Sequence, residues 1–167
     1  GGSVVGVDGP LVGGACGGTI TRTWNVSDAC GNPAITRTQI ITVDDNTPPV
    51  IAAAPAAVTV ECIDDVPAMS SLTWTDNCDA GGSVAGVDGP LVGGACGGTI
   101  TRTWNVSDAC GNPAITRTQI ITVDDNTPPV LAAAPAAVTV ECIDDVPAMT
   151  SLTWTDNCDA GGSVAGV

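Results

Sequence analysis

The chain has 167 residues, a net charge of −14, and neither His nor Lys. Without these residues the usual general bases and amine nucleophiles are missing, so we expect that the protein is not an enzyme. The negative charge opposes binding to nucleic acids and to anionic membrane surfaces, which attract Lys and Arg. Because 44% of the residues are hydrophobic and only 13% are charged, the composition also differs from that of disordered chains.

The sequence consists of an 80-residue repeat. Residues 81–160 repeat residues 1–80 except at three positions, and residues 161–167 begin another copy. The three exchanges are Val5 to Ala85, Ile51 to Leu131, and Ser70 to Thr150. A period of this length fits a small domain repeated in tandem. We therefore expect the chain to be a section of a longer array.

Two consecutive prolines mark the boundary between repeats. Residues 43–49 read VDDNTPP, and the same string recurs at 123–129. Proline holds the chain extended and keeps the preceding residue out of the helical region. The predicted organisation is one complete domain at 47–125 (the central repeat). The C-terminal half of a repeat at 1–46 (the first half-repeat) precedes it, and the N-terminal half at 126–167 (the last half-repeat) follows.

The residue pattern of each repeat predicts β-strands. Polar and apolar residues alternate over 57–61, 99–106 and 115–123, and shorter strands are expected at 50–53, 71–75 and 83–87. Gly-Gly, Gly-Pro and Asn-Pro pairs separate these segments. The prediction is an all-β fold of tandem immunoglobulin-like β-sandwiches. No apolar stretch reaches the length of a membrane span, so no membrane insertion is expected in this segment.

Several stretches resemble a known family. They are TRTWNVSDACGN at 101–112, TQIITV at 118–123, VEC at 60–62 and TDNCD at 75–79. They resemble the hyalin-repeat-like, immunoglobulin-like tandem modules of large cell-surface adhesins and gliding-associated proteins of Bacteroidota. The Gly-rich segment 81–97 departs from that pattern. The resemblance implies an extracellular, non-enzymatic array of β-sandwiches at the cell surface.

The central repeat contains four cysteines, which we expect to form structural disulfides. Without His or a CxxC spacing, a zinc site is the weaker alternative, and free thiols are another. In an immunoglobulin-like sandwich, Cys78 and Cys110 follow two strands that run in the same direction. We therefore expect these two cysteines to be bonded at the end that faces the preceding domain. Cys62 and Cys96 precede the same strands, which favours a second bond at the opposite end.

A sequence-local pairing is the alternative to this scheme. It would join Cys62 to Cys78 and Cys96 to Cys110, across strands of about 20–30 Å. That separation exceeds the limit of about 7 Å for bridged Cα atoms. The favoured pairing leaves four cysteines for neighbouring repeats, namely Cys16, Cys30, Cys142 and Cys158.

Acidic residues gather at the predicted turns. By the same strand-direction argument, the linker and two loops meet at one end of the domain, and their oxygens would suit Ca²⁺, which takes 6–8 oxygen ligands. The candidate ligands are Asp44, Asp45, Asn46, Asp76, Asp79 and Asp108, with Asp124, Asp125, Asn126, Asp156 and Asp159 at the next junction. The alternative is that these residues simply form solvated turns, for which Asp is well suited.

These observations favour a structural function. The leading hypothesis is an extracellular filament or stalk of disulfide-stapled domains, stiffened by Ca²⁺, with other copies of the repeat as end-to-end partners. The alternative is an adhesin that binds glycans or other cells, since repetition also serves avidity. Trp74 and Trp104 could stack on sugars, although a single Trp in a sheet more often anchors the core.

Overall fold

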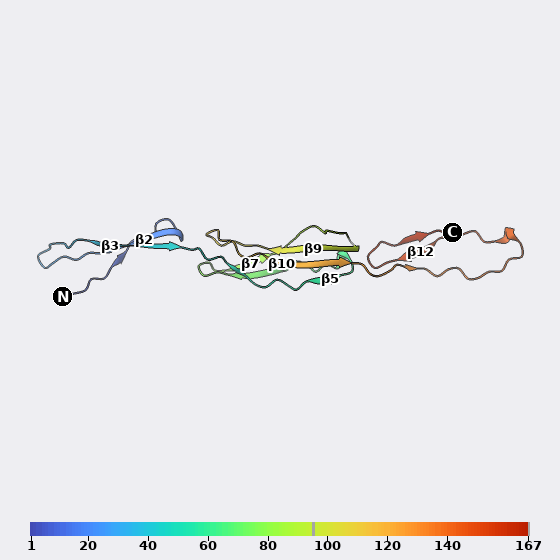
Figure 1. The fold of residues 1–167 in the computed structure, drawn as a ribbon, viewed down its shortest axis with the longest axis horizontal. Coiled ribbons are helices and arrows are strands. Elements are labelled where there is room, and N and C mark those ends of the chain that lie inside the picture. Colours follow the sequence, from blue (N-terminus) through green and yellow to red (C-terminus); the bar gives the residue numbers. More distant parts are fainter. Residues whose placement is uncertain (95, 167) are drawn as a thin grey trace. The chain divides into compact units, whose positions relative to one another are not determined.

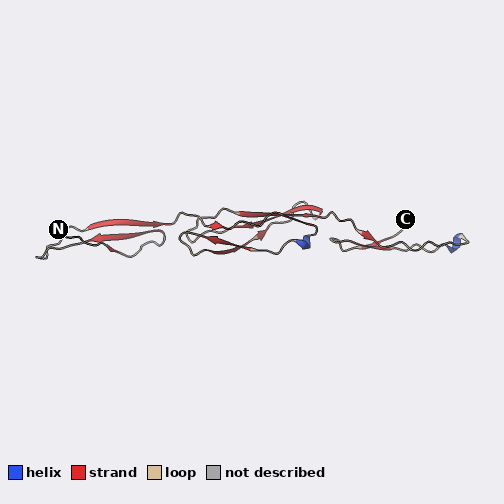
Figure 2. Ribbon diagram, turned by 90° about the horizontal axis from the view of Figure 1, so that it is seen from below, coloured by secondary structure: helices blue, strands red, loops and turns tan. Residues whose placement is uncertain are grey.

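The computed structural model describes residues 1–94 and 96–166, which form short strands in four sheets (Figure 1). No α-helix occurs within these described ranges, and the two blue segments in Figure 2 are the short 3₁₀ turns η1 (Ile63–Asp65) and η2 (Ile143–Asp145). The predicted all-β class is confirmed, and the arrangement is consistent with an immunoglobulin-like β-sandwich. The chain divides into two compact units. Unit 1 comprises Gly1–Ala53, Ser71–Gly86 and Trp104–Arg117, and unit 2 comprises Ala54–Ser70, Val87–Thr103 and Thr118–Val167.

Unit 1 contains two three-stranded sheets with antiparallel pairing. The first has the order β1-β2-β3, formed by Val7–Asp8, Cys16–Trp24 and Arg37–Asp44. The second has the order β4-β6-β7, formed by Val50–Ile51, Ser71–Thr75 and Gly82–Ala85. A Cβ on Gly82 would lie 3.2 Å from Nε1 of Trp74. Glycine therefore lets the indole of Trp74 lie flat against the neighbouring strand.

Unit 2 contains a four-stranded and a three-stranded sheet. The first has the order β5-β10-β9-β8, formed by Val58–Val60, Arg117–Asp124, Cys96–Trp104 and Val87–Asp88. The second has the order β11-β12-β13, formed by Val130–Leu131, Leu152–Thr155 and Gly162–Val164. β5 pairs in parallel with β10, with Val58 opposite Ile121. Two short 3₁₀ turns, η1 (Ile63–Asp65) and η2 (Ile143–Asp145), complete the elements.

The start of β9 differs from the sequence prediction. The strand begins at Cys96, three residues before the predicted start, and includes Gly97 and Gly98. A Cβ on Gly98 would collide with the carbonyl oxygen of Gly94. The glycines thus allow the preceding loop to fold back onto the strand, where Val92 forms a bridge with Thr99. This part of the strand was not predicted because its glycines show no alternation of polar and apolar residues.

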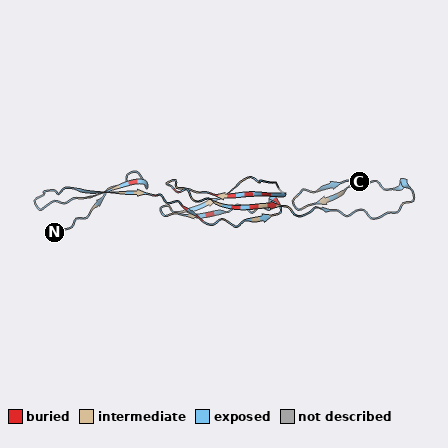
Figure 3. Ribbon diagram, viewed as in Figure 1, coloured by how far each residue is buried: buried red, intermediate tan, exposed pale blue. Residues whose placement is uncertain are grey.

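The apolar core of unit 2 lies on one face of β9 and β10 (Figure 3). It is centred on Ile100, Ile121 and Val123, which are 6%, 0% and 0% exposed. Because alternate residues of a strand share a face, Ile121 and Val123 point to the same side of β10. Partly buried hydrophobic residues pack against this cluster; they are Val58, Val60, Val66 and Leu91.

Arg102 is the buried cation of this unit. Its Nε and Nη2 donate to Oδ1 and Oδ2 of Asp88 at 2.6 and 2.9 Å. Its remaining N–H groups donate to the carbonyl oxygens of Pro67 and Ala68 at 2.9 and 3.3 Å. The hydrogen bonds from Arg102 hold the pKa of Asp88 below its usual value.

We predict that Asp88→Asn destabilises the protein by about 2 kcal/mol, because Arg102 would lose its counter-charge. The Asp88 side chain is 32% exposed, which keeps the loss below that of a fully buried pair. The pKa of Asp88 is lowered on folding, so its ionised form stabilises the folded protein. This stabilisation is fully present above the unfolded pKa of about 3.9 and is lost as the pH falls below that value. Urea unfolding at pH 7 and at pH 2 would measure both effects.

The matched control is Asp8→Asn, which removes the equivalent carboxylate from the exposed Arg22–Asp8 pair. Arg22 has no carbonyl partner among the residues that the structure describes, and we expect little change in stability. Equal losses in the two variants would contradict the role assigned to burial of Arg102.

Candidate functional site

Two disulfides join cysteines that belong to successive repeats. In unit 1, Cys16 is bonded to Cys110, with a Cα–Cα distance of 5.2 Å and a sequence separation of 94. In unit 2, Cys62 is bonded to Cys158, with a Cα–Cα distance of 5.1 Å and a separation of 96. Both separations exceed one 80-residue period. Each bond therefore crosses a predicted boundary between repeats.

The predicted Cys78–Cys110 and Cys62–Cys96 bonds are wrong. Strand direction did assign Cys110 to the end that faces the preceding repeat, and there it is bonded to Cys16. Cys62, assigned to the opposite end, is bonded to Cys158 of the following repeat. The error was to assume that each small domain closes its own disulfides. The free cysteines are all exposed, and they are Cys30, Cys78, Cys96 and Cys142.

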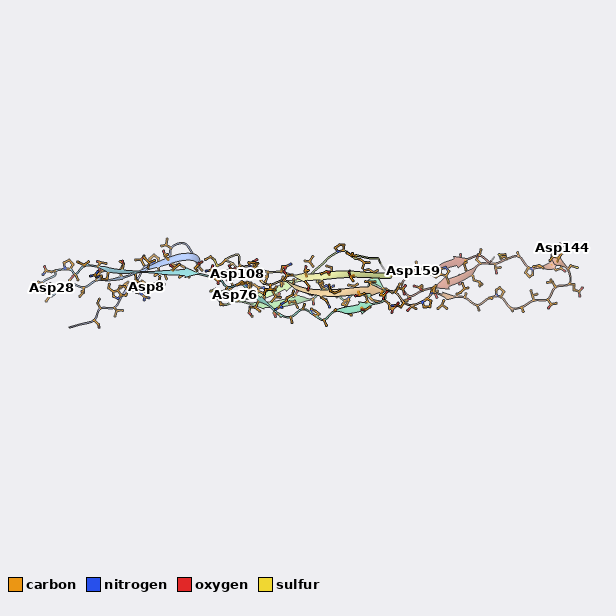
Figure 4. The ribbon with its side chains drawn as sticks, in the orientation of Figure 1. Asp8, Asp28, Asp76, Asp108, Asp144 and Asp159 are labelled. Carbon is orange, nitrogen blue, oxygen red and sulfur yellow. A yellow bond between two sulfur atoms is a disulfide. The ribbon has the colours of Figure 1, made fainter. Side chains whose placement is uncertain are left out.

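The linker after β3 and the loops after β6 and β9 meet in unit 1. Asp79 Oδ2 accepts a hydrogen bond from the backbone N–H of Ala109 at 2.8 Å. The side-chain amide of Asn112 donates to the carbonyl oxygen of Asp45 at 2.9 Å. The same amide donates to Oδ2 of the buried Asp108 at 2.7 Å. Asp76 and Asp108 of this group are labelled in Figure 4. Three segments thus bring acidic residues together beside the Cys16–Cys110 bond.

Two carboxylates of this group have hydrogen-bond partners for only one of their two oxygens. Asp45 is 7% exposed, and its Oδ1 accepts from the N–H of Thr47 at 3.1 Å. Asp76 Oδ2 accepts from the N–H groups of Cys78 and Asp79 at 2.8 and 3.1 Å. Asp45 Oδ2 and Asp76 Oδ1 are buried and have no hydrogen-bond partner within the described ranges. Such atoms are costly to bury, and a bound cation would reduce that cost.

The electrostatics of the group follow from these contacts. Loss of hydration and the charges of Asp45 and Asp76 raise the pKa of the Cys78 thiol, which places both carboxylates near its sulfur. Burial acts to raise the pKa of Asp108, but the hydrogen bonds from Asn112, together with those from the backbone N–H groups of Cys110 and Gly111, outweigh it and leave the pKa below the usual value. Asp108 is therefore ionised at neutral pH, in a group that contains no cation among its hydrogen-bond partners in the described chain.

Unit 2 brings three equivalent residues close together. One carboxylate oxygen each of Asp125 and Asp156 and the sulfur of Cys158 lie within 4.8 Å of one another. These residues are the 80-residue equivalents of Asp45, Asp76 and Cys78. Because Cys158 is disulfide-bonded, the two carboxylates are the ligand groups that remain for a hard cation.

The other predicted ligands take different positions. The exposed Asp44 accepts from the side-chain amide of Asn46 at 2.9 Å. At the next linker, Asp124 accepts from the side-chain amide of Asn126 at 3.2 Å. Asp159 is exposed as well.

Glu61 was not among the predicted ligands. Its Oε2 accepts from the N–H of Asn126 at 3.0 Å and from Oγ1 of Thr127 at 3.3 Å. Its position beside Cys62, as one of two Glu in the chain, was the available signal.

Residues 50–123 match the model of a family described as the HYR-like domain with 4 cysteines. The match supports a hyalin-repeat-like module. It covers β4 through most of β10 and contains four cysteines, of which Cys62 and Cys110 are bonded to cysteines outside the matched range. No curated protein and no solved structure matches the chain. Both disulfides fit an oxidising environment.

Among the residues that the structure describes, no helix has the length and apolar character needed to cross a membrane.

We predict that the double variant Cys62→Ser/Cys158→Ser lowers the free energy of unfolding by about 2–4 kcal/mol, because the bond closes a long loop in the unfolded chain. The measurement is urea unfolding under non-reducing conditions. Cys142→Ser is the matched control, since Cys142 is exposed and free in this chain. A control variant that is as unstable as the double variant would contradict the assignment.

Proposed function

We propose that the chain is a section of an extracellular structural filament or stalk, built from tandem immunoglobulin-like modules that are covalently joined end to end. The observation that carries this proposal is that both disulfides connect one repeat with the next. A catalytic domain gains nothing from such bonds, whereas a stalk gains resistance to extension. Trp104 is fully buried, which disfavours the alternative of a glycan-binding surface built on that indole.

The two disulfide loops interleave along the chain. In sequence order, Cys62 lies inside the loop closed by Cys16 and Cys110, and Cys110 lies inside the loop closed by Cys62 and Cys158. Tension between the ends therefore passes through a disulfide instead of through the whole backbone. The stretched path is about 70 residues in the oxidised chain, or about 240 Å, against about 560 Å for the reduced chain.

Single-molecule pulling on the 167-residue chain tests this function. We expect the oxidised protein to stop extending near about 240 Å, and the reduced protein to extend to about 560 Å. A variant with Ser at Cys16, Cys62, Cys110 and Cys158 should behave like the reduced protein without any reductant. Full extension of the oxidised protein at low force would overturn the proposed structural function.

We also propose that Ca²⁺ binds in the acidic group of unit 1 that contains Asp45, Asp76, Asp79 and Asp108. Support comes from the buried, unpartnered oxygens of Asp45 and Asp76 and from the nearby ionised Asp108. Asp45 and Asp76 would supply ligand oxygens, and a divalent ion would offset their mutual repulsion. The recurrence of two of these carboxylates as Asp125 and Asp156 in unit 2 is independent support.

Calorimetric titration with Ca²⁺ tests this proposal. We expect binding that is lost in Asp76→Asn, together with the stabilisation of about 2.7 kcal/mol that a ligand provides at 100 times its Kd. Asp156→Asn is the matched control. Asp156 belongs to unit 2, so this variant should retain the binding in unit 1. Equal titrations of the wild type and Asp76→Asn would show that the group consists of solvated turns.

A further inference from the structure

The outer face of the β5-β10-β9 part of the sheet in unit 2 consists almost entirely of threonine. Ile100, Ile121 and Val123 point into the core from β9 and β10, and Val58 and Val60 pack against them from β5. Because successive side chains of a strand alternate between its two faces, the residues between these positions point outward. The outward residues over 58–60, 99–103 and 118–122 form the threonine face; they are Thr59, Thr99, Thr101, Thr103, Thr118, Ile120 and Thr122.

Threonines of neighbouring strands lie opposite one another on this face. In the parallel pair, Thr122 of β10 lies opposite Thr59 of β5. In the first half-repeat, β2 and β3 are the 80-residue equivalents of β9 and β10, and two further pairs occur there; they are Thr19–Thr42 and Thr23–Thr38. The equivalent pairs in the central repeat, where β9 neighbours β10, are Thr99–Thr122 and Thr103–Thr118. Thr122 therefore has a threonine on both sides.

The threonine face stays open when a repeat is complete. Three of its threonines are exposed both in the first half-repeat and in the central repeat; they are Thr19, Thr21 and Thr38, and Thr99, Thr101 and Thr118. The inner face behaves differently, since Ile41 is half-buried and the equivalent Ile121 is fully buried. Completing the repeat thus covers the inner face of the sheet and leaves the threonines in contact with solvent.

The hydroxyl groups of this face are available to a ligand. Thr103 Oγ1 donates to the carbonyl oxygen of Val87 at 3.5 Å. The hydroxyl groups of the other five threonines have no hydrogen-bond partner among residues 1–94 and 96–166.

The face also carries no charge, although the chain as a whole has a net charge of −14. The next acidic residues along β5 and β10 are Glu61 and Asp124, and both accept hydrogen bonds from Asn126. A surface with free hydroxyl groups and no charge suits a neutral partner that itself presents hydrogen-bond donors and acceptors.

The spacing of the threonines identifies such a partner. Strands of a sheet lie about 4.7–4.9 Å apart, and alternate residues along one strand are about 6.6–6.8 Å apart. The oxygen atoms on the prism faces of an ice crystal repeat on a rectangular lattice of similar dimensions. Threonine is restricted at χ1 by its branched Cβ, so each hydroxyl and each methyl group keeps a fixed direction. Water ordered at these spacings can join the crystal with little rearrangement.

We propose that the threonine face binds to the surface of ice crystals through a layer of water held by the threonine hydroxyl and methyl groups. This site is independent of the proposed structural function. The 167-residue chain contains two such faces, one on β2 and β3 in unit 1 and one on β5, β9 and β10 in unit 2. Two faces on one chain serve avidity wherever both reach the same crystal.

Slow freezing of a dilute solution onto a cold finger tests the proposal. Growing ice excludes solutes that do not bind to it, so these concentrate in the remaining liquid. We expect the wild-type chain to be enriched in the ice relative to a non-binding reference protein frozen in the same solution. Wild-type protein that stays in the liquid with the reference protein would overturn the proposal, whatever the variants do.

A pair of variants assigns the binding to the threonine face. Thr21→Lys/Thr101→Lys places an ammonium group on each face, which would lose hydration against the crystal, and we expect incorporation into ice to fall about tenfold. The matched control is Ile35→Lys/Ile115→Lys, which adds the same charges at residues that are 82% and 80% exposed and lie outside the threonine face. Thermal melting followed by circular dichroism verifies that both variants fold. Equal incorporation of the two variants would contradict the assignment.

Pairing of two copies through this face is the competing use of the same surface. After alkylation of the free thiols, we expect the wild type to sediment as a monomer in the cold. A dimer that Thr21→Lys/Thr101→Lys abolishes would assign the face to a second copy and overturn ice binding. The disulfides and the pulling behaviour are measured without ice, so failure of this proposal leaves the proposed function to be judged separately.

Discussion

Disulfides between repeats constrain the linkers, which would otherwise be free to bend. The Cys16–Cys110 bond holds the loop after β9 against the preceding repeat, where Asn112 reaches the carbonyl of Asp45. The Cys62–Cys158 bond has the same effect in unit 2, where the amide of Asn157 lies 3.5 Å from the sulfur of Cys62. Because each bond spans more than 90 residues, it also removes much conformational freedom from the unfolded chain.

Cationic and acidic side chains occupy different parts of the fold. Arg117 donates to the carbonyl oxygen of Ile51 in β4, and Arg102 donates to the carbonyl oxygen of Pro67 in the segment before β6 and also neutralises Asp88. Among residues 1–94 and 96–166, the ion pairs are Arg22–Asp8 and Arg102–Asp88, and neither includes Asp45, Asp76, Asp125 or Asp156. Two carboxylates as close as Asp125 and Asp156 repel each other by about 3–4 kcal/mol at an effective dielectric constant near 20. This repulsion opposes the geometry that the disulfides impose, which is why an added cation is expected to stiffen the joint.

Alternation of polar and apolar residues located strands such as β6 (Ser71–Thr75), which matches its predicted range, but not the Gly-rich start of β9. Strand direction also separated Cys110 from Cys62 correctly. The pairing could not be predicted because it depends on how the loops of adjacent repeats approach each other, and residue periodicity within one repeat carries no information on that. Glu61 was missed for the same reason, since its contacts with Asn126 and Thr127 arise only where the next linker begins.

Interleaved disulfide loops also protect the chain against proteolytic cuts. Every peptide bond between Cys16 and Cys158 lies inside at least one loop, so a single cut there leaves one covalent molecule. Cleavage sites are scarce as well, because the chain contains four Arg and no Lys, Phe or Tyr. One of those Arg residues, Arg102, is buried in a strand, where a protease cannot bind the extended backbone without local unfolding. A nicked section of the array would thus keep its length and its connection to both neighbours.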